Sequence, residues 1–341
     1  MAADDPFLAA CRGERGAHVP VWFMRQAGRS LPEYRQARGS GSILEAIRDP
    51  DLAAELTMQP VRRYGVDAAV LFSDIMVPVA ATGFGVDIEP GVGPVVSHPF
   101  AGSADLDRLR PLVPDEDTPY VGAAVRILAR ELDVPLIGFA GAPFTIASYL
   151  IEGRPSRTYE RTKSMMWSQP RLWDALLERL ADQAIASLGA QVAAGAQAVQ
   201  LFDSWAGALD PDDYCDRVLP ASRRIFEALA GLGVPRVHFG VGTAHLLELL
   251  AAAGADVVGV DWRVPLGAAR QRLGPGVAVQ GNLDPIACVA GWEATKTKAR
   301  RVLDEAGAEP GHIFNLGHGV LPQTDPAVLA RLVEMVHEHR P

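Results

Sequence analysis

The sequence predicts an α/β protein in which eight parallel strands, each followed by helical segments, close into a single (β/α)8 barrel spanning residues 1–341. Two observations predict this class. Short apolar runs alternate with longer amphipathic segments, and the runs are continuously hydrophobic, as strands covered on both faces are. An open, doubly wound sheet is the alternative, and the count of eight favours the barrel. No shift in composition marks a second domain.

The predicted strands share an apolar, often β-branched character and end at glycine or polar residues. They are residues 19–24, 67–72, 134–140, 198–202, 235–240, 256–261, 276–281 and 312–317.

Helices are expected where Asp directly precedes Pro, because Asp caps a helix N-terminus and Pro is tolerated in the first turn. Ser168 stands ahead of an apolar-periodic run and is expected to cap a helix in the same way. The four Asp-Pro pairs begin at Asp49, Asp210, Asp284 and Asp325.

Two insertions interrupt the alternation. Residues 84–97 predict a β-hairpin after the second strand, and residues 153–167 form a polar, arginine-rich segment after the third. Both are expected near the active-site face of the barrel.

The composition limits the class of partner. The chain has 48% hydrophobic residues and a formal charge of −9, and it contains no run of Lys and Arg. Nucleic acids and anionic membranes usually select a basic surface, so neither is an expected partner. A ligand rich in carboxylates would need a local arginine cluster.

The sequence also predicts a cytoplasmic protein. Its three cysteines are an odd number with wide spacing, which suits a reducing compartment. The first residues contain no basic segment followed by an apolar one, and no apolar run approaches the ~20 residues of a membrane span.

Active sites of such barrels lie at the C-terminal ends of the strands. Directly after the first strand, PVWFMRQAGR (20–29) supplies Arg25 and Arg29. A guanidinium is almost never buried without a partner, so a negative group is expected beside each. If a helix begins there, both arginines share one face and can grip a bidentate acceptor. Internal acids such as Glu33 or Asp74 are the alternative to a ligand's carboxylates.

Asp74, in FSDI, follows the second strand and faces the same mouth. It is either a salt-bridge partner of the arginines or a group that recognises a donor or a developing positive charge on a substrate. Between arginines the carboxylate is expected to remain ionised, so that it only accepts hydrogen bonds.

Three further polar residues lie at strand ends or in the loops beyond them. His318 stands between glycines in NLGHG, which allows close approach of backbone and ligand. Tyr149 in FTIASYL and Ser204 in FDSWAG supply hydroxyl groups. Each of the three is equally consistent with a structural role in the core.

Several chemistries lack their motifs. The histidines show neither HExxH nor metal-ligand spacing, and we expect no metal site. The three lysines, Lys163, Lys296 and Lys298, fall in the polar insertion or a late helix, which argues against a Schiff base. The sequence contains no GxGxxG after the first strand, no GxxxxGKS/T and no GxSxG. The mouth therefore shows no sign of a cofactor.

PVWFMRQAGR (20–29) and GFAGAPFTIASYLIEG (138–153) closely resemble the two signature segments of the uroporphyrinogen decarboxylase family. FSDI, FDSWAG, QGNLDP and NLGHG follow in the family's order and spacing, so the resemblance covers essentially the whole chain. It implies that the four acetate side chains of uroporphyrinogen III are decarboxylated to methyl groups, giving coproporphyrinogen III in heme and tetrapyrrole biosynthesis. It also implies a homodimer that needs no cofactor.

The resemblance further implies catalytic roles for Asp74, Arg25 and Tyr149. Asp74 would accept hydrogen bonds from the pyrrole N–H groups and stabilise the cation formed on the ring. Arg25 would hold the acetate, with Arg29 and Arg35 as further counterions of the substrate's carboxylates. The residues that would add hydrogen bonds to the substrate are Gln26, Tyr149, Ser204 and His318.

Two positions depart from the family's pattern. Ser30 stands where many relatives have tyrosine, and Trp205 replaces a histidine found in some members. Neither removes a group that the reaction requires.

Two other functions compete with this interpretation. A barrel methyltransferase that acts on a thiol through zinc needs His and Cys ligands at strand ends. Cys215 and Cys288 fall in predicted helices instead, and Cys11 precedes the first strand. A non-catalytic tetrapyrrole carrier would have no need of Asp74 to stabilise a pyrrole cation.

Overall fold

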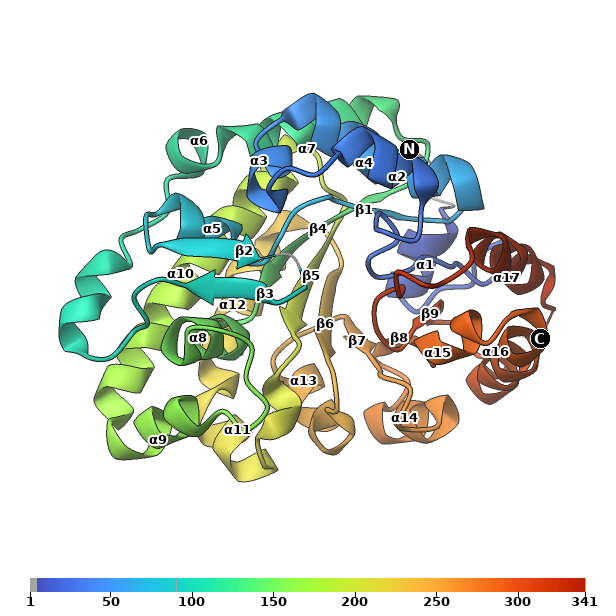
Figure 1. The fold of residues 1–341 in the computed structure, drawn as a ribbon. Coiled ribbons are helices and arrows are strands. Elements are labelled where there is room, and N and C mark those ends of the chain that lie inside the picture. The colour runs from blue at the N-terminus through green and yellow to red at the C-terminus, as the bar shows by residue number, and fades with distance from the viewer. Residues whose placement is uncertain (1–4, 90, 341) are drawn as a thin grey trace.

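The computed structural model describes residues 5–89 and 91–340, and its centre is a parallel sheet that curls round with helices outside it (Figure 1). Seven strands pair in the order β1-β4-β5-β6-β7-β8-β9. Each corresponds to a predicted strand, so the parallel α/β class is confirmed. Their bounds are β1 Ala69–Val70, β4 Leu136–Gly141, β5 Ala198–Asp203, β6 Arg236–Gly240, β7 Val257–Gly259, β8 Ala278–Leu283 and β9 His312–Leu316.

The first predicted strand, residues 19–24, does not form, and this prediction is corrected. Val21 makes a single parallel bridge to Phe314 of β9, and its carbonyl accepts the Asp67 N–H (2.8 Å) on the other side. The hydrogen-bond ladder does not extend, because Pro20 has no N–H and because side chains accept three other N–H groups of the segment, among them that of Phe23, which donates to Gln26 Oε1 (3.0 Å). The Val21 N–H donates to Asp67 Oδ2 (2.7 Å) and the Met24 N–H to Asn315 Oδ1 (3.2 Å).

The helices are the following: α1 Pro6–Cys11, α2 Pro32–Arg38, α3 Ile43–Ile47, α4 Pro50–Tyr64, α5 Val77–Ala81, α6 Pro114–Asp117, α7 Pro119–Glu131, α8 Pro143–Glu152, α9 Glu160–Ser168, α10 Pro170–Ala194, α11 Pro211–Arg217, α12 Leu219–Leu229, α13 Leu247–Ala252, α14 Leu266–Leu273, α15 Pro285–Val289, α16 Trp292–Ala306 and α17 Pro326–Glu338. Short 3-10 helices cover Ser103–Arg108, Ala206–Ala208, Ala230–Leu232 and Ala244–Leu246.

The predicted Asp-Pro helix starts are confirmed. In each, the Asp side chain accepts a backbone N–H of the first turn and Pro occupies that turn. The prediction for Ser168 is wrong, because Ser168 ends α9 and donates its hydroxyl to Ser164 O (2.6 Å). Gln169 then precedes α10.

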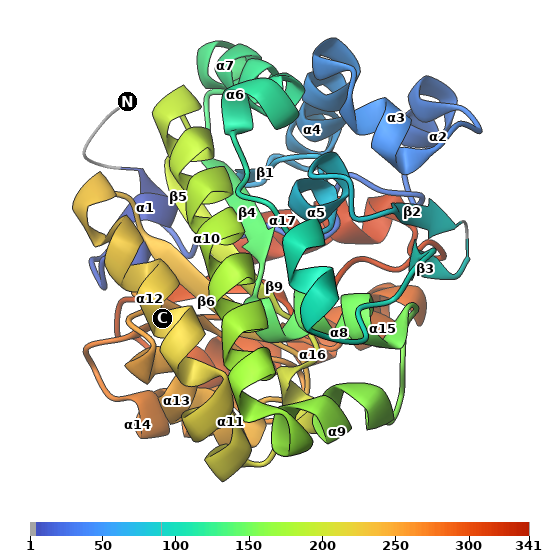
Figure 2. The ribbon, with the colours of Figure 1, turned by 90° about the vertical axis from the view of Figure 1, so that its left-hand side faces the viewer.

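Both insertions are present. The predicted hairpin pairs β2 Val86–Glu89 with β3 Gly93–Val96, with Val86 opposite Val96. It stands apart from the curled sheet, beside α5 and α8 at one edge of the molecule (Figure 2). The polar insertion starts as a loop after α8 and continues as α9.

The core fills the space between sheet and helices. Its buried apolar side chains form one contiguous cluster that begins at Phe7 and ends at Val336. Trp22 and Trp173 are its largest fully buried members. Among the helices of the described residues, none combines the length and the apolar character that crossing a bilayer requires.

Candidate active site

A cavity of about 210 Å³ lies at the C-terminal ends of the strands. Comparable hollows elsewhere, of about 190 Å³ at the opposite strand ends and 330 Å³ between α10 and α12, contain none of the predicted site residues. The strand-end cavity brings together five of the seven. These are Arg25, Asp74, Tyr149, Ser204 and His318.

Asp74 is held in the loop between β1 and α5. One carboxylate oxygen accepts the Met76 N–H (2.9 Å). The loop itself is fixed where the Phe72 N–H donates to Thr57 Oγ1 of α4 (2.9 Å). Burial raises the pKa of Asp74 above its ordinary value, and the Met76 N–H and the positive charge of Arg25 oppose that rise. Asp74 is thus a partly buried acceptor that lines the cavity.

Arg25 occupies a turn rather than the helix that the spacing suggested. Its backbone is left-handed, with φ 58°, and the next helix, α2, begins only at Pro32. The Val320 N–H donates to Met24 O (2.8 Å), which ties this turn to the loop after β9. Arg25 and Arg29 therefore do not share a helix face.

Neither Glu33 nor Asp74, the acids proposed as charge partners inside the protein, forms a salt bridge with Arg25 or Arg29. Glu33 pairs with Arg63 instead (3.0 Å). Within the part of the chain that the structure describes, no salt bridge of 4.0 Å or less reaches Arg25 or Arg29. Arg25, an exposed residue, therefore stands at the cavity with no salt-bridge partner among residues 5–89 and 91–340.

Gln26 is corrected. It is fully buried, its amide donates to Ala68 O (3.1 Å), and its amide oxygen accepts the Phe23 N–H (3.0 Å). Both ends of the side chain hydrogen-bond to backbone groups at or beside the Arg25 turn, and Gln26 does not line the cavity. Arg35 acts similarly, donating to Arg29 O (2.6 Å). Arg29 is exposed and lies outside the cavity lining.

Tyr149, on α8, packs against Trp205, with ring centroids 3.9 Å apart and ring planes tilted by 36°. Tyr159 contacts the other side of Trp205 edge-on (5.2 Å). Burial and the nearby charge of Asp74 raise the pKa of Tyr149, so the hydroxyl keeps its proton and can donate it in a hydrogen bond.

Ser204 belongs to the loop after β5, and a buried hydroxyl fixes this loop. Thr145 Oγ1 donates to Asp203 Oδ1 (2.9 Å) and accepts the Trp205 N–H (3.2 Å). Asp203 is fully buried. Thr145 therefore determines where both Ser204 and Trp205 lie relative to the cavity.

His318 follows β9. Burial, with help from the charges of Arg25 and Arg263, lowers the pKa of His318 to about 4. The imidazole is neutral near pH 7 and can offer one donor and one acceptor. Arg263 lies at the end of β7 and pairs with Asp261 (2.5 Å). The sequence alone assigned it no function.

Sequence reasoning also missed the floor of the cavity. Phe139, Phe202 and Phe239 come from the neighbouring strands β4, β5 and β6, and they meet edge to face (5.4 and 6.1 Å). Phe139 and Phe202 are only partly buried, although their strands are otherwise buried. Large apolar residues near strand ends looked like core and gave no signal of a site.

The arrangement suits a ligand with an apolar ring surface and acidic substituents. That surface would rest on the phenylalanines, and ring N–H groups would meet the partly buried carboxylate of Asp74. Carboxylates at the rim would find Arg25, the Tyr149 hydroxyl and neutral His318.

Known proteins agree with this chemistry. Residues 2–339 match the family described as Uroporphyrinogen decarboxylase (URO-D). A uroporphyrinogen decarboxylase of Streptomyces coelicolor is 63% identical over 98% of this chain and 94% of its own length. One of Salinispora tropica is 60% identical over 98% and 91%. The chain belongs to the uroporphyrinogen decarboxylase family.

The predicted family resemblance is thereby confirmed, and with it the activity: decarboxylation of uroporphyrinogen, a carboxy-lyase step of heme biosynthesis. The fold is shared more widely. A solved structure of a methyltransferase from Methanosarcina mazei superposes with a TM-score of 0.79 over 98% of both chains. At 22% identity that likeness concerns the fold alone.

Proposed function

We propose that this member of the uroporphyrinogen decarboxylase family converts the four acetate side chains of uroporphyrinogen III to methyl groups in the strand-end cavity, without a cofactor. The observation that carries the proposal is that one largely apolar cavity is lined both by Arg25, which has no salt-bridge partner among the described residues, and by the partly buried carboxylate of Asp74.

The substrate supplies its own electron sink. Adding a proton to the pyrrole α-carbon next to the acetate gives a cationic, imine-like ring. The bond to the carboxylate then breaks, carbon dioxide leaves, and the electron pair enters the ring. A proton added to the exocyclic carbon and loss of the α-proton restore the pyrrole. The net change per acetate is one proton taken up and one carbon dioxide released.

Asp74 lowers the barrier to forming that cation. An ionised acceptor that is already partly buried needs little reorganisation when positive charge develops on the pyrrole N–H groups, and such preorganised groups contribute roughly 3–4 kcal/mol in comparable cases. Arg25 holds the reacting acetate, and Tyr149, Ser204 and His318 donate hydrogen bonds to other carboxylates. Arg29 stands outside the cavity and receives the outermost ones.

The remaining proposals concern assembly. The 19–24 segment occupies the eighth strand position and closes the sheet into a (β/α)8 barrel, supported by its hydrogen bonds to Phe314 and Asp67, and residues 1–341 form one domain. The protein acts as a homodimer in the cytoplasm, which its three free cysteines suit. Light scattering coupled to size-exclusion chromatography is expected to give twice the chain mass.

Turnover tests the function directly. Uroporphyrinogen III, kept reduced, is incubated with the protein, and the oxidised products are separated by their number of carboxylates. We expect eight-carboxylate substrate to become four-carboxylate product. If folded protein binds the substrate but its carboxylate count does not change, the carrier interpretation is correct instead.

A further inference from the structure

We propose that His18, Asp67 and His337 form a binding site for a divalent transition-metal ion of the zinc type, at the end of the sheet opposite the cavity. The three residues are far apart in the sequence and come from the loop after α1, the segment before β1 and the last turn of α17. One potential ligand atom of each lies within 4.8 Å of the others.

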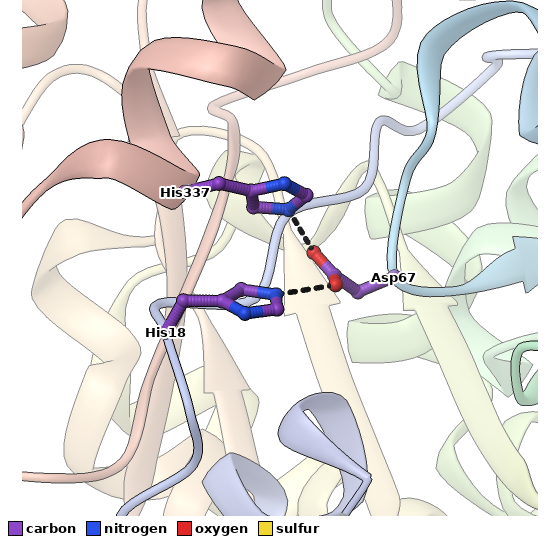
Figure 3. A group of neighbouring side chains, drawn as sticks. All are labelled: His18, Asp67 and His337. Carbon is purple, nitrogen blue, oxygen red and sulfur yellow. Dashed lines mark hydrogen bonds and ion pairs between the residues drawn. The ribbon is translucent and has the colours of Figure 1, made fainter.

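Both imidazoles point at the same carboxylate (Figure 3). His18 Nε2 lies 2.7 Å from Asp67 Oδ1, and His337 Nε2 lies 2.8 Å from Asp67 Oδ2. Two imidazoles and one carboxylate are the ligand types that zinc prefers, and three protein ligands leave its fourth position to water.

The three side chains must move slightly to make room for the ion. Zinc holds nitrogen and oxygen at about 2.0–2.2 Å, which in a tetrahedron places ligand atoms roughly 3.3 Å apart. The two nitrogen–oxygen pairs now at 2.7–2.8 Å must therefore part by roughly half an ångström, and the two Nε2 atoms, which lie within 4.8 Å of each other, must reach the same spacing. The histidine side chains are 25% and 30% exposed, so they have the freedom to do so.

The surroundings already orient the carboxylate. The Val21 N–H donates to Asp67 Oδ2 (2.7 Å), and this backbone contact can persist as an outer-shell bond when the carboxylate binds an ion. His18 also borders a hollow of about 190 Å³, which gives solvent and ions a path to the cluster. An ion here would exchange the protons on the two Nε2 atoms for metal bonds.

The position predicts a structural consequence. Asp67 precedes β1, whereas Asp74 follows it, so the ion would be remote from the cavity. It would tie the segment before the Val21 bridge and the last helix to the start of the sheet. We therefore expect it to raise thermal stability and to leave turnover unchanged.

The experiment uses the full chain with the exposed Cys215 replaced, Cys215→Ser, so that its thiol cannot bind the metal. Zinc is titrated in competition with a chromophoric chelator. We expect one site per chain with an affinity in the micromolar range or tighter, and a zinc-dependent rise in Tm. His18→Gln and His337→Gln, which keep an amide donor for Asp67, should each weaken binding at least tenfold. His98→Gln, at an exposed histidine of the hairpin region, is the control and should bind as the parent does.

A second measurement needs no substitution at the site. Zinc should protect His18 and His337 from modification by diethylpyrocarbonate, as mapped by mass spectrometry, and should not protect His98. The proposal is overturned if the parent binds no stoichiometric zinc, if both Gln variants bind it normally, or if His18 and His337 react equally with and without zinc.

Discussion

Gly319 leaves the space that the side chain of Arg25 occupies. A Cβ atom built on Gly319 would lie 2.5 Å from Arg25 Cδ and 2.8 Å from its Cγ, closer than real Cβ atoms come to other atoms. The backbone of the loop after β9 therefore serves as the surface against which the arginine stem rests. The glycines flanking His318 make room for protein as well as for ligand.

We expect Gly319→Ala to displace Arg25 and to lower kcat/KM about 10- to 100-fold, because a shift of about 1 Å in a positioning group costs that much. Unfolding free energy should fall by about 1 kcal/mol, because the clash reaches Cγ and Cβ of Arg25 and forces the arginine out of its rotamer. Gly276→Ala, where a Cβ meets nothing within 4 Å, is the matched control. Steady-state kinetics and urea unfolding of both variants make the comparison. Parental kinetics in Gly319→Ala would show that the position of Arg25 is unimportant.

Asp74→Asn tests the cation-stabilising charge. The amide keeps the shape and an acceptor for the Met76 N–H, but it carries no charge. We expect kcat to fall about 100-fold or more. Because burial raises the pKa of Asp74, ionised Asp74 is a destabilising group, and the variant should unfold at an equal or higher urea concentration.

Asp304→Asn removes an exposed carboxylate of α16 and is the control for Asp74→Asn. It should match the parent in rate and in stability. Near-parental decarboxylation by Asp74→Asn, measured on the same substrate preparation, would refute the role assigned to this carboxylate.

The class of fold could be predicted from the sequence because continuous apolar runs and Asp-Pro helix starts are local signals. Both correspond to strands and helices in the structure. The sequence could not show that residues 19–24 do not form a strand. The Val21 N–H donates to the side chain of Asp67, a residue more than forty positions away in the sequence. The expectation of a helix that carries Arg25 and Arg29 on one face was wrong for a similar reason. The left-handed backbone of Arg25 is set by contacts with the loop after β9, which no local spacing encodes.

The site residues were likewise predictable only where a local sequence signal marked them. Polar residues at or beyond strand ends marked Asp74, Tyr149, Ser204 and His318, and although the last three were equally consistent with a structural role, all four line the cavity. Gln26 looked identical in sequence, yet it satisfies backbone groups. The partly buried Phe202, with Phe139 and Phe239 on the cavity floor, could not be predicted as a site residue, because an apolar residue in a strand predicts the core.

The acid limb of the pH profile should report Asp74. The pKa of Asp74 is raised above the ordinary value of 3.8. We therefore expect kcat/KM to reach its maximum at higher pH and to fall as the pH drops through that raised pKa, because Asp74 then becomes neutral. His318, with its pKa lowered to about 4, should produce no inflection near 6.5. Protonating His318 would add positive charge beside the carboxylates and act in the opposite direction.

The profile of His318→Asn separates the two groups. It should keep the acid limb at the parental position, with a moderately higher KM from the lost hydrogen bond. Disappearance of the limb in this variant would assign it to His318 and remove the support for Asp74. The profile is measured as kcat/KM, which reports groups of the free enzyme.

Thr145→Val removes the hydroxyl that joins Asp203 to the Trp205 N–H while keeping the side-chain volume. It leaves a buried carboxylate oxygen and a backbone donor without their partner, which should cost about 1–3 kcal/mol of unfolding free energy. Because Trp205 packs on Tyr149, kcat should fall as well. Thr297→Val, at an exposed position of α16, is the control. Urea unfolding that is unchanged in Thr145→Val would contradict the positioning role.

Removing metal ions should leave decarboxylation unaffected, even if His18, Asp67 and His337 bind one. The proposed chemistry uses the substrate's own ring as electron sink, and the three residues lie at the other end of the sheet. We expect protein treated with EDTA and then freed of it to keep its kcat and KM while its Tm falls. Initial rates and Tm are measured on the same sample, before and after zinc is returned. A rate that drops with chelation and recovers with zinc or magnesium would show that the reaction itself needs a metal, and the cofactor-free scheme would then be wrong.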